Sequence, residues 1–338
     1  MKNKSSMQKI FSRRSFIGNI AKGSLYSIAF AAPYRSSANR SSFNSFEDDI
    51  SKKINIGIIG AENSHTAAFG KLFNIDNIFP GLEVKYVWGE TEAFARIAME
   101  KGNIPNIVSH PNDMLGKIDA LIVDHRHGKY HLDAAMPFLE EGIPIFIDKP
   151  FCYRKQKGEE FLSKARQLKT PVTSYSSIAH SFATFDIKNQ ISQMESKENI
   201  IMYGPLDLDS KYGGVFFYGP HLIEPLIYII DNRAVKVRVN KNNSTGSASI
   251  IFENGISVTL IFSVKNRGWQ TFVETKKGFV EIKATVEKKV PSKNYLDMVT
   301  MFKTGKEPRK HSNILHGIAI LEALEKSVNS GGWENVDQ

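Results

Sequence analysis

The residues best suited to chemistry in this sequence follow four short apolar runs that have the character of buried strands. In a doubly wound sheet, ligands bind outside the carboxyl ends of the parallel strands. Polar side chains at four such ends therefore predict one site at one edge of a sheet. The segments are Gly60–His65, Gly89–Glu90, Asp124–His127 and Asp148–Pro150.

The first of these segments, within "GIIGAENSH", is typical of a strand-to-helix turn that binds phosphate. Gly60 suits the tight turn, and Asn63 and Ser64 can cap the following helix, whose free amides attract an anion. In a dinucleotide fingerprint G-x-G-x-x-G, however, the second and third glycines would stand where Glu62 and His65 do. A carboxylate beneath a pyrophosphate is repelled, so we expect Glu62 at the edge of the turn, where it can accept ribose hydroxyls.

The segment "DHRHGKYH" concentrates metal-ligand side chains within eight residues. Zinc or another transition metal accepts such a set. Against a metal, no second cluster completes the geometry, and Arg126 and Lys129 repel a cation. We therefore predict no metal, and keep a metal-dependent lyase or isomerase as an alternative. The ligand-type residues are Asp124, His125, His127 and His131.

The elements that must position these residues change character near residue 178. From residue 53 to about 177, short apolar strands alternate with helices, which predicts a Rossmann-like doubly wound parallel sheet. From 178 to about 330, apolar residues alternate along longer strands, which predicts an α+β domain with an open, mainly antiparallel sheet. "ENGI" and "KKGF" predict hairpin turns there. The last helix, Asn313–Ser327, is expected to pack back near the first domain.

The positive charge of the chain lies almost entirely at its start. Eight of the net nine positive charges fall within residues 1–46, which hold no acid, so the body carries about +1 and a nucleic-acid partner is not expected. "SRRSFIG" and the weakly apolar stretch after it predict a twin-arginine-type signal peptide, residues 1–38, followed by a polar spacer, residues 39–52. This predicts an exported, periplasmic protein without a membrane span. A basic tail on a cytosolic protein is the alternative.

Three segments carry a resemblance to a known family. "INIGIIG", "HLDAAMPFLEEGIPIFIDKP" and "GGVFFYGPHLIEPLIY" are similar to motifs of the glucose–fructose oxidoreductase / inositol dehydrogenase (Gfo/Idh/MocA) family, and the resemblance spans roughly residues 53–330. It implies a domain that binds NAD or NADP, a substrate domain, and hydride transfer with a sugar or polyol. It also implies that Lys149 stabilises charge on the substrate oxygen, and that His221, oriented by Glu224, takes the hydroxyl proton.

The chemistry and position of further residues suggest contacts to the two ligands. Glu90, one place later than usual after its strand, is expected to bind ribose and to favour NAD. Arg126, His127 and Tyr130 are expected to bind sugar hydroxyls, and Tyr218 to stack on a sugar face. A homo-oligomer through the second-domain sheet is also expected. The predicted cofactor residues are Gly60, Glu62, Asn63, Ser64, His65, Glu90, Asp124 and Lys149.

The departures from the family pattern leave a second hypothesis open. Phe217 stands where the family has an acid that shares the proton work, Arg126-His127-Gly128 replaces Thr-Pro-Asn, and Asp148 replaces Glu. One hypothesis is an exported enzyme that holds its dinucleotide tightly and returns it to its starting redox state within each catalytic cycle. The other is an exported sugar-binding protein that has lost the dinucleotide, which Glu62 and Phe217 favour.

Overall fold

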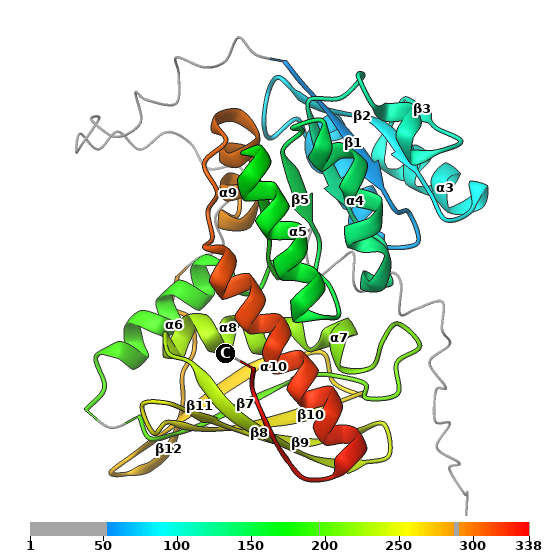
Figure 1. The fold of residues 1–338 in the computed structure, drawn as a ribbon. Coiled ribbons are helices and arrows are strands. Elements are labelled where there is room, and N and C mark those ends of the chain that lie inside the picture. The colour runs from blue at the N-terminus through cyan, green and yellow to red at the C-terminus, as the bar shows by residue number, and fades with distance from the viewer. Residues whose placement is uncertain (1–52, 196, 287–290, 338) are drawn as a thin grey trace, which may run out of the picture. The chain divides into compact units, whose positions relative to one another are not determined.

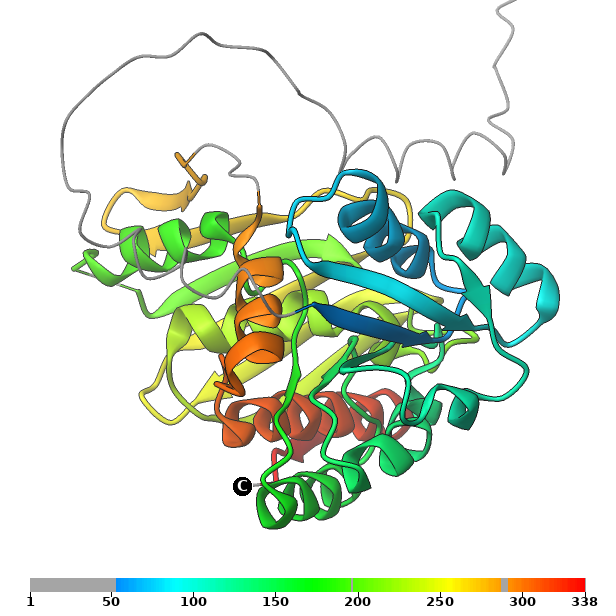
Figure 2. The ribbon, with the colours of Figure 1, turned by 90° about the horizontal axis from the view of Figure 1, so that it is seen from above.

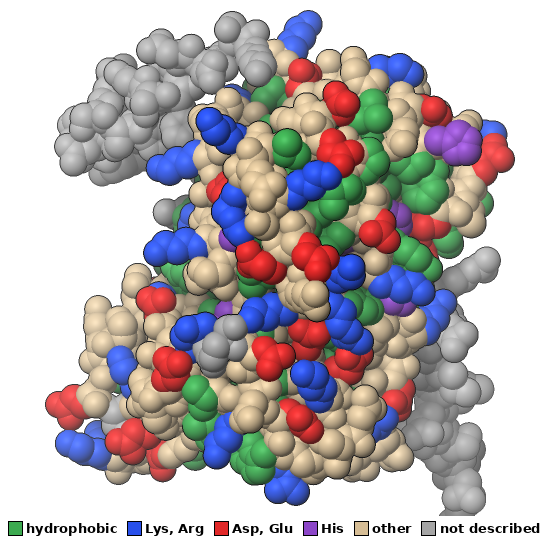
Figure 3. All heavy atoms as spheres, viewed as in Figure 1, with side chains coloured by type: hydrophobic (Ala, Val, Ile, Leu, Met, Phe, Trp, Pro, Cys, Tyr) green, Lys and Arg blue, Asp and Glu red, His purple; other side chains and the backbone are tan. Residues whose placement is uncertain are grey.

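The computed structural model describes residues 53–195, 197–286 and 291–337. The predicted signal peptide and spacer, residues 1–52, lie outside the described residues. Within the described part, no helix combines the length and the apolar character needed to cross a membrane. The face in Figure 3 carries basic and acidic side chains interspersed, in keeping with the small net charge of the body.

The first sheet has six parallel strands in the order β3-β2-β1-β4-β5-β6. Helices cover both of its faces, and α4 and α5 lie side by side on one of them (Figure 1). The strands are β1 Ile54–Ile59, β2 Leu82–Trp88, β3 Asn106–Ile107, β4 Ala120–Val123, β5 Ile145–Ile147 and β6 Val172–Ser174. The helices are α2 Ser64–Gly70, continued as a π-helix over Lys71–Ile75, then α3 Glu92–Gly102, α4 His131–Glu140 and α5 Lys155–Leu168, with 3-10 turns at Pro111–Met114 and Gly128–Tyr130.

The continuous apolar runs of the strands explain why both faces of this sheet are covered. Along β4, Leu121 and Val123 join the core beneath α4 and α5, while Ala120 and Ile122 join the core on the opposite face, beneath α2 and α3. Successive side chains of a strand point to opposite faces, so a strand apolar at every position needs a layer on each side. The predicted doubly wound parallel sheet is confirmed.

The second sheet has seven strands in the order β12-β11-β7-β10-β9-β8-β13, antiparallel except for the pair β7 and β10. Its strands alternate buried and more exposed residues, as the sequence predicts. The strands are β7 Asn199–Pro205, β8 Ala234–Asn242, β9 Thr245–Phe252, β10 Ser257–Ser263, β11 Gln270–Thr275, β12 Gly278–Glu281 and β13 Trp333–Asn335. The helices of this half are α6 Phe182–Ser192, α7 Val215–Tyr218, α8 Pro220–Ile230, α9 Lys293–Thr304 and α10 His311–Ser330.

Two helices from the end of the chain connect the two halves. α9 packs on the first sheet, where Met298 and Phe302 join the core of β1 and α2, and Figure 2 shows α9, in orange, beside the blue β1. α10 packs against α5 and α8, and its Glu322 side chain accepts a hydrogen bond from the Lys155 amide at 2.9 Å. The prediction that the last helix returns to the first domain is therefore confirmed, whereas β13 was not predicted from the sequence.

Candidate functional site

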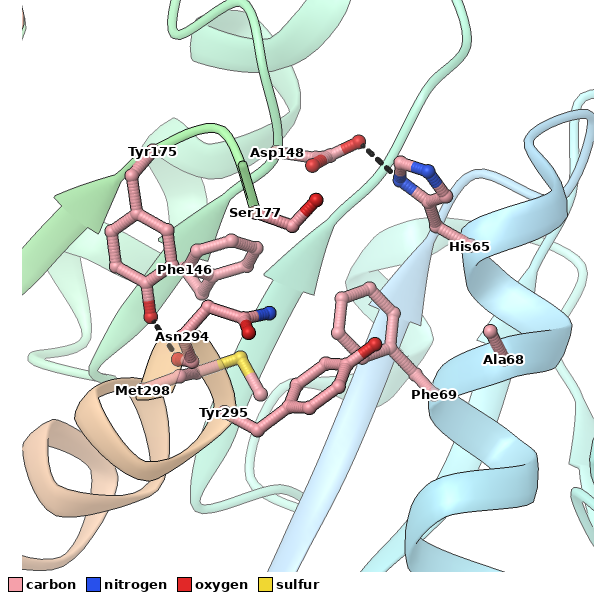
Figure 4. Close-up of a pocket in the computed structure, with 10 residues that line it drawn as sticks. All are labelled: His65, Ala68, Phe69, Phe146, Asp148, Tyr175, Ser177, Asn294, Tyr295 and Met298. Carbon is pink, nitrogen blue, oxygen red and sulfur yellow. Dashed lines mark hydrogen bonds and ion pairs between the residues drawn. The ribbon is translucent and has the colours of Figure 1, made fainter. Parts of the chain in front are cut away.

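The four predicted loops meet at the carboxyl edge of the first sheet, and a hydrogen-bond network links three of them. Asn63 Nδ2 donates to Asp124 Oδ1 at 2.7 Å and to Asp148 Oδ2 at 3.2 Å. His65 Nδ1 lies 2.9 Å from the same Asp148 oxygen (Figure 4). The turn after β1 is thereby held to the ends of β4 and β5.

Gly60 forms the tight turn that the sequence predicts. Its φ is +110°, and a Cβ added there would lie 2.5 Å from the His125 amide nitrogen and 2.6 Å from the Asp124 carbonyl carbon. Both the backbone conformation and the close approach require glycine. Beyond the turn, Asn63 caps α2 and accepts from the His65 amide at 3.3 Å. The amides of Asn63 and Ser64 have no acceptor among the described residues.

Glu90 reaches the turn from the end of β2, although it stands one residue later than the usual acid. Its Oε2 accepts hydrogen bonds from the Ala61 amide at 2.8 Å and the Glu62 amide at 2.9 Å. Its Oε1 is buried and has no partner within the described part of the chain. A buried acceptor oxygen without a donor at this place suits a ribose hydroxyl, which is the role that an acid after the second strand has in dinucleotide sites.

Glu62 is bound by the second half of the chain. Its Oε1 accepts a hydrogen bond from the Tyr212 hydroxyl, in the segment between β7 and α7. The Tyr212 carbonyl in turn accepts from the Tyr153 hydroxyl at 2.5 Å, and that hydroxyl lies 3.0 Å from His127 Nδ1. The sequence predicts Glu62 at the edge of the turn but gives no sign of Tyr212, which is 150 residues away.

Asp124 and Asp148 are adjacent buried carboxyl groups whose pKa values shift in opposite directions. Burial and the neighbouring Asp148 raise the pKa of Asp124 well above its usual value. Burial opposes ionisation of Asp148 too, but His65 and Lys149 outweigh it and hold its pKa below the usual value. The Thr66 hydroxyl lies 2.9 Å from the Gly60 carbonyl and 2.7 Å from Asp124 Oδ2, so it connects the turn after β1 to the end of β4.

Lys149 lies buried between the first sheet and the α7 segment. Its Nζ donates to the Phe217 carbonyl at 3.2 Å and lies 4.9 Å from the centre of the Phe217 ring and 5.7 Å from that of Tyr218. Burial lowers the pKa of Lys149, while the charges of Asp148 and Asp124 oppose this shift. An ammonium so enclosed acts on nearby oxygen atoms with little screening by water.

His221 opens α8 and faces the end of β6. Its Nδ1 lies 2.7 Å from Ser176 Oγ. Burial, with the positive charge of Lys149 and His65, lowers the pKa of His221 well below its usual value, so the ring is neutral. The Lys149 ammonium and the His221 ring each lie 5.7 Å from the centre of the Tyr218 ring, so the two residues contact the same aromatic side chain.

Among the hydrogen bonds of the described residues, none joins Glu224 to the His221 ring, so Glu224 does not orient the ring by the direct hydrogen bond that the sequence suggests. Its Oε2 accepts from the Ser176 amide at 2.9 Å and from Arg309 Nη1 at 2.7 Å. Ser176 is therefore the residue that orients the ring, and Glu224 acts on it through Ser176. Sequence reasoning missed Ser176, although it follows the last strand of the parallel sheet, and that position was the available signal.

The three histidines of the segment "DHRHGKYH" do not point their ring nitrogens at one common position. His125 packs against Trp88, with ring centres 5.7 Å apart, and burial lowers its pKa to about 3. His131 Nδ1 lies 2.7 Å from the Pro150 carbonyl and its Nε2 2.9 Å from the His125 carbonyl. His65, Asp124 and Asp148 do place ligand-type atoms within 4.8 Å of one another, but Asn63 and Thr66 already satisfy the carboxylates.

The predicted substrate residues lie around the same edge with different degrees of exposure. Arg126 stacks over Tyr212, with its guanidinium carbon 4.5 Å from the ring centre. The Tyr218 ring lies 5.7 Å from that of His221. Tyr130 is 48% exposed and packs against His127, with ring centres 5.6 Å apart.

Behind His65 and Asp148 lies a cavity of about 50 Å³ (Figure 4). Phe69, Phe146, Tyr175 and other side chains fill most of the space around it, and the Tyr175 hydroxyl is bound by the Asn294 carbonyl. A cavity of this size holds one or two water molecules. It is too small for a sugar or a nicotinamide ring, so the candidate site is the strand edge that carries Lys149.

Residues 54–176 match the model of an oxidoreductase family with an NAD-binding Rossmann fold, GFO_IDH_MocA. No curated protein matches the sequence significantly.

Several solved structures share the fold of both halves. The myo-inositol dehydrogenase from Lactobacillus casei in complex with NAD(H) and myo-inositol is 12% identical, with a TM-score of 0.69, over 85% of this chain and 97% of its own. The scyllo-inositol dehydrogenase of the same organism, with NAD(H) and scyllo-inositol, is 15% identical, with a TM-score of 0.70, over 84% and 99%. GenD2 from gentamicin A biosynthesis, in complex with NAD, is 11% identical, with a TM-score of 0.72, over 90% and 100%.

These identities support the fold alone, while the family model covers the whole parallel-sheet half. The parallel-sheet half, with its turn at Gly60, its acid at Glu90 and its lysine at the end of β5, therefore matches the NAD-binding Rossmann domain of the Gfo/Idh/MocA oxidoreductase family.

Proposed function

We propose that this protein is an NAD(H)-dependent oxidoreductase that acts on a hydroxyl group of a sugar or polyol. The observation that carries the proposal is that Lys149, from the end of β5, and His221, from the start of α8, both contact Tyr218, beside the edge where a Rossmann domain binds its cofactor. A cation and a neutral base in one partly dry site are the two groups that oxidation of an alcohol requires.

The residues at this edge fit NAD. The orphaned Oε1 of Glu90 suits a ribose hydroxyl, and the unbound amides of Asn63 and Ser64, at the start of α2, suit a phosphate group. Glu90 favours NAD over NADP, because its carboxylate would repel a 2′-phosphate. When bound, NAD⁺ supplies the acceptor for the hydride.

Residues of the chain then accept the proton of the substrate hydroxyl and stabilise the negative charge on its oxygen. In this proposal His221 carries its ring proton on Nδ1 and donates it to Ser176 Oγ, which leaves Nε2 free to take the proton of the substrate hydroxyl. Lys149 hydrogen-bonds the same oxygen and stabilises the negative charge that develops as the carbon gives up its hydride. Phe217 leaves no acid beside His221 at that position, so the histidine takes the proton alone.

The test is binding and turnover with purified protein. We expect NADH to bind in calorimetry, and a panel of sugars and polyols with NAD⁺ to yield reduced nicotinamide by absorbance. Lys149→Met should retain NADH binding and lose turnover. Turnover by Lys149→Met within a few-fold of the parent would refute the role of the lysine.

A sugar-binding protein without a dinucleotide is the second candidate. The observation that favours it is the engagement of the Ala61 and Glu62 amides by the Glu90 carboxylate, which fills hydrogen bonds of the turn from within the chain. Sugar binding without any NADH binding in the same calorimetry would establish this candidate.

We also propose that the protein is exported and holds its cofactor tightly. The two arginines of "SRRSFIG" support this, as does a nearly neutral body behind a basic start. Export of a reporter fused to residues 1–52 should depend on both arginines. Unchanged export after Arg13→Lys with Arg14→Lys would contradict the twin-arginine interpretation.

A further inference from the structure

Arg126 presents a positive charge that the protein itself does not pair. Its guanidinium carbon lies 4.5 Å from the centre of the Tyr212 ring and 5.5 Å from that of Phe217. Its Nε is buried without a hydrogen-bond partner, and no acid among the described residues lies within ion-pair distance of it. Glu62, which also influences Tyr212, has one carboxylate oxygen held by the Tyr212 hydroxyl.

Arg126 shares an aromatic ring with the lysine of the proposed active site. The ammonium of Lys149 lies 4.9 Å from the centre of the Phe217 ring, on which Arg126 also stacks. The charge of Arg126 lowers the pKa of Lys149, as expected for neighbouring cations. The donors of Arg126 are therefore beside the substrate oxygen that Lys149 is proposed to bind.

Two departures from the family pattern change the charge of this site in the same direction. Phe217 removes the acid that the resemblance implies at that position, and Arg126 adds a cation in a segment where the family has Thr-Pro-Asn. A neutral polyol would gain little from the added charge. A substrate with its own carboxylate would be repelled by an acid at position 217, which this chain lacks, and is attracted by the added arginine.

We propose that the substrate is a sugar acid whose carboxylate binds Arg126. The inference rests on the proposed oxidoreductase function and specifies its substrate class. One face of the guanidinium is covered by Tyr212, so its in-plane N–H groups are the donors left for a ligand. A planar fork of this kind matches the two oxygens of a carboxylate, which a lysine ammonium does not.

The experiment compares matched sugars by calorimetry, after NADH binding has been measured on the same preparation. D-glucuronate is paired with D-glucose, and D-galacturonate with D-galactose, in the presence of NADH. We expect each acid to bind about ten- to hundredfold more tightly than its neutral partner, as a charge-assisted hydrogen-bond pair provides. D-glucose 6-phosphate is the third probe, and we expect it to bind more weakly than the uronates.

Arg126→Met tests the residue itself, and Lys129→Met is its matched control. Lys129 is an exposed cation three residues further along the same segment, so its loss changes the net charge equally. We expect Arg126→Met to abolish the preference for the acids and to leave NADH binding intact, and Lys129→Met to change neither. If Arg126→Met and Lys129→Met lose the preference for the acids equally, the preference arises from the net positive charge of the protein and the inference is wrong.

The comparison of sugars in the parent protein decides the matter even if Arg126→Met does not fold. NADH binding without any preference for an acid over its neutral partner overturns the inference and leaves the proposed function standing. Tightest binding of glucose 6-phosphate overturns the carboxylate class. Absence of NADH binding overturns the proposed function, and the substrate inference with it.

Discussion

The ion pair between Arg309 and Glu224 offers a sharp test of how the candidate site is held together. The two side chains are only 8% and 9% exposed, and Arg309 Nη1 lies 2.7 Å from Glu224 Oε2. Arg309 also donates to the Ser174 carbonyl at 2.9 Å and to the Asn313 carbonyl at 3.1 Å. Replacement of Arg309 by Met removes these donors and leaves a buried carboxylate whose remaining partner is the Ser176 amide at 2.9 Å.

The expected cost follows from the unpaired charge. Removing one partner of a buried ion pair typically costs about 3–5 kcal/mol, because the desolvated charge that remains loses its compensation. We expect Arg309→Met to lower the free energy of unfolding by about that amount. The double variant with Glu224→Gln removes the charge as well, so it should recover most of the loss and end within about 1–2 kcal/mol of the parent.

The assay is urea unfolding followed by circular dichroism. Arg166→Met is the control, since Arg166 bonds Glu159 at 2.5 Å on the surface, with both side chains about half exposed, and such a pair is worth less than about 1 kcal/mol. If Arg309→Met unfolds like Arg166→Met, or if the double variant is as unstable as Arg309→Met, the charge argument is wrong.

Three further predictions concern the cofactor, the chemistry and pH. Lys149→Met should lower kcat/KM by about a hundred- to a thousandfold in steady-state kinetics, while an exposed lysine replaced in the same way should have no effect. Glu90→Gln should weaken NADH binding by about tenfold and should reduce the preference for NADH over NADPH, both measured by calorimetry. Burial lowers the pKa of His125 to about 3 and the pKa of His316 to about 4. At pH values below the ordinary histidine pKa of about 6.5, the unfolded chain therefore binds more protons than the folded protein. Stability should therefore fall as pH drops from about 6.5 to 5, and His316→Gln should flatten this fall in urea titrations.

The features of the fold that could be predicted from the sequence are those set by local patterns. Continuous apolar runs in the first half and alternating runs in the second specify two kinds of sheet, and the turns at Gly255 and Gly278 have the positive φ expected of them. β13 was missed because Trp333–Asn335 is short and polar, and it becomes a strand by pairing with the edge of β8. A strand defined by its partner leaves little signal in its own residues.

The same distinction applies to the site. The edge at which Gly60, Glu90, Asp124 and Lys149 meet was predictable, because topology brings the ends of parallel strands together whatever the side chains do. Which side chains then bond could not be predicted, because the partners come from distant segments. Glu62 binds Tyr212 across 150 residues of sequence, and no periodic pattern relates those two positions.

Glu224 illustrates how a local argument fails. Its position three residues after His221 places both on one face of α8, which favours a direct contact. The buried carboxylate instead pairs with Arg309, 85 residues later, and with the Ser176 amide at the end of β6. A buried charge is stabilised far more by a cation and an amide than by a neutral imidazole, so its pairing follows the strongest available donors rather than the nearest residue in sequence. By this reasoning Ser176→Ala should alter the pH profile of turnover through His221, whereas Glu224→Gln with Arg309→Met should alter it less, since the serine hydroxyl that touches the ring is retained.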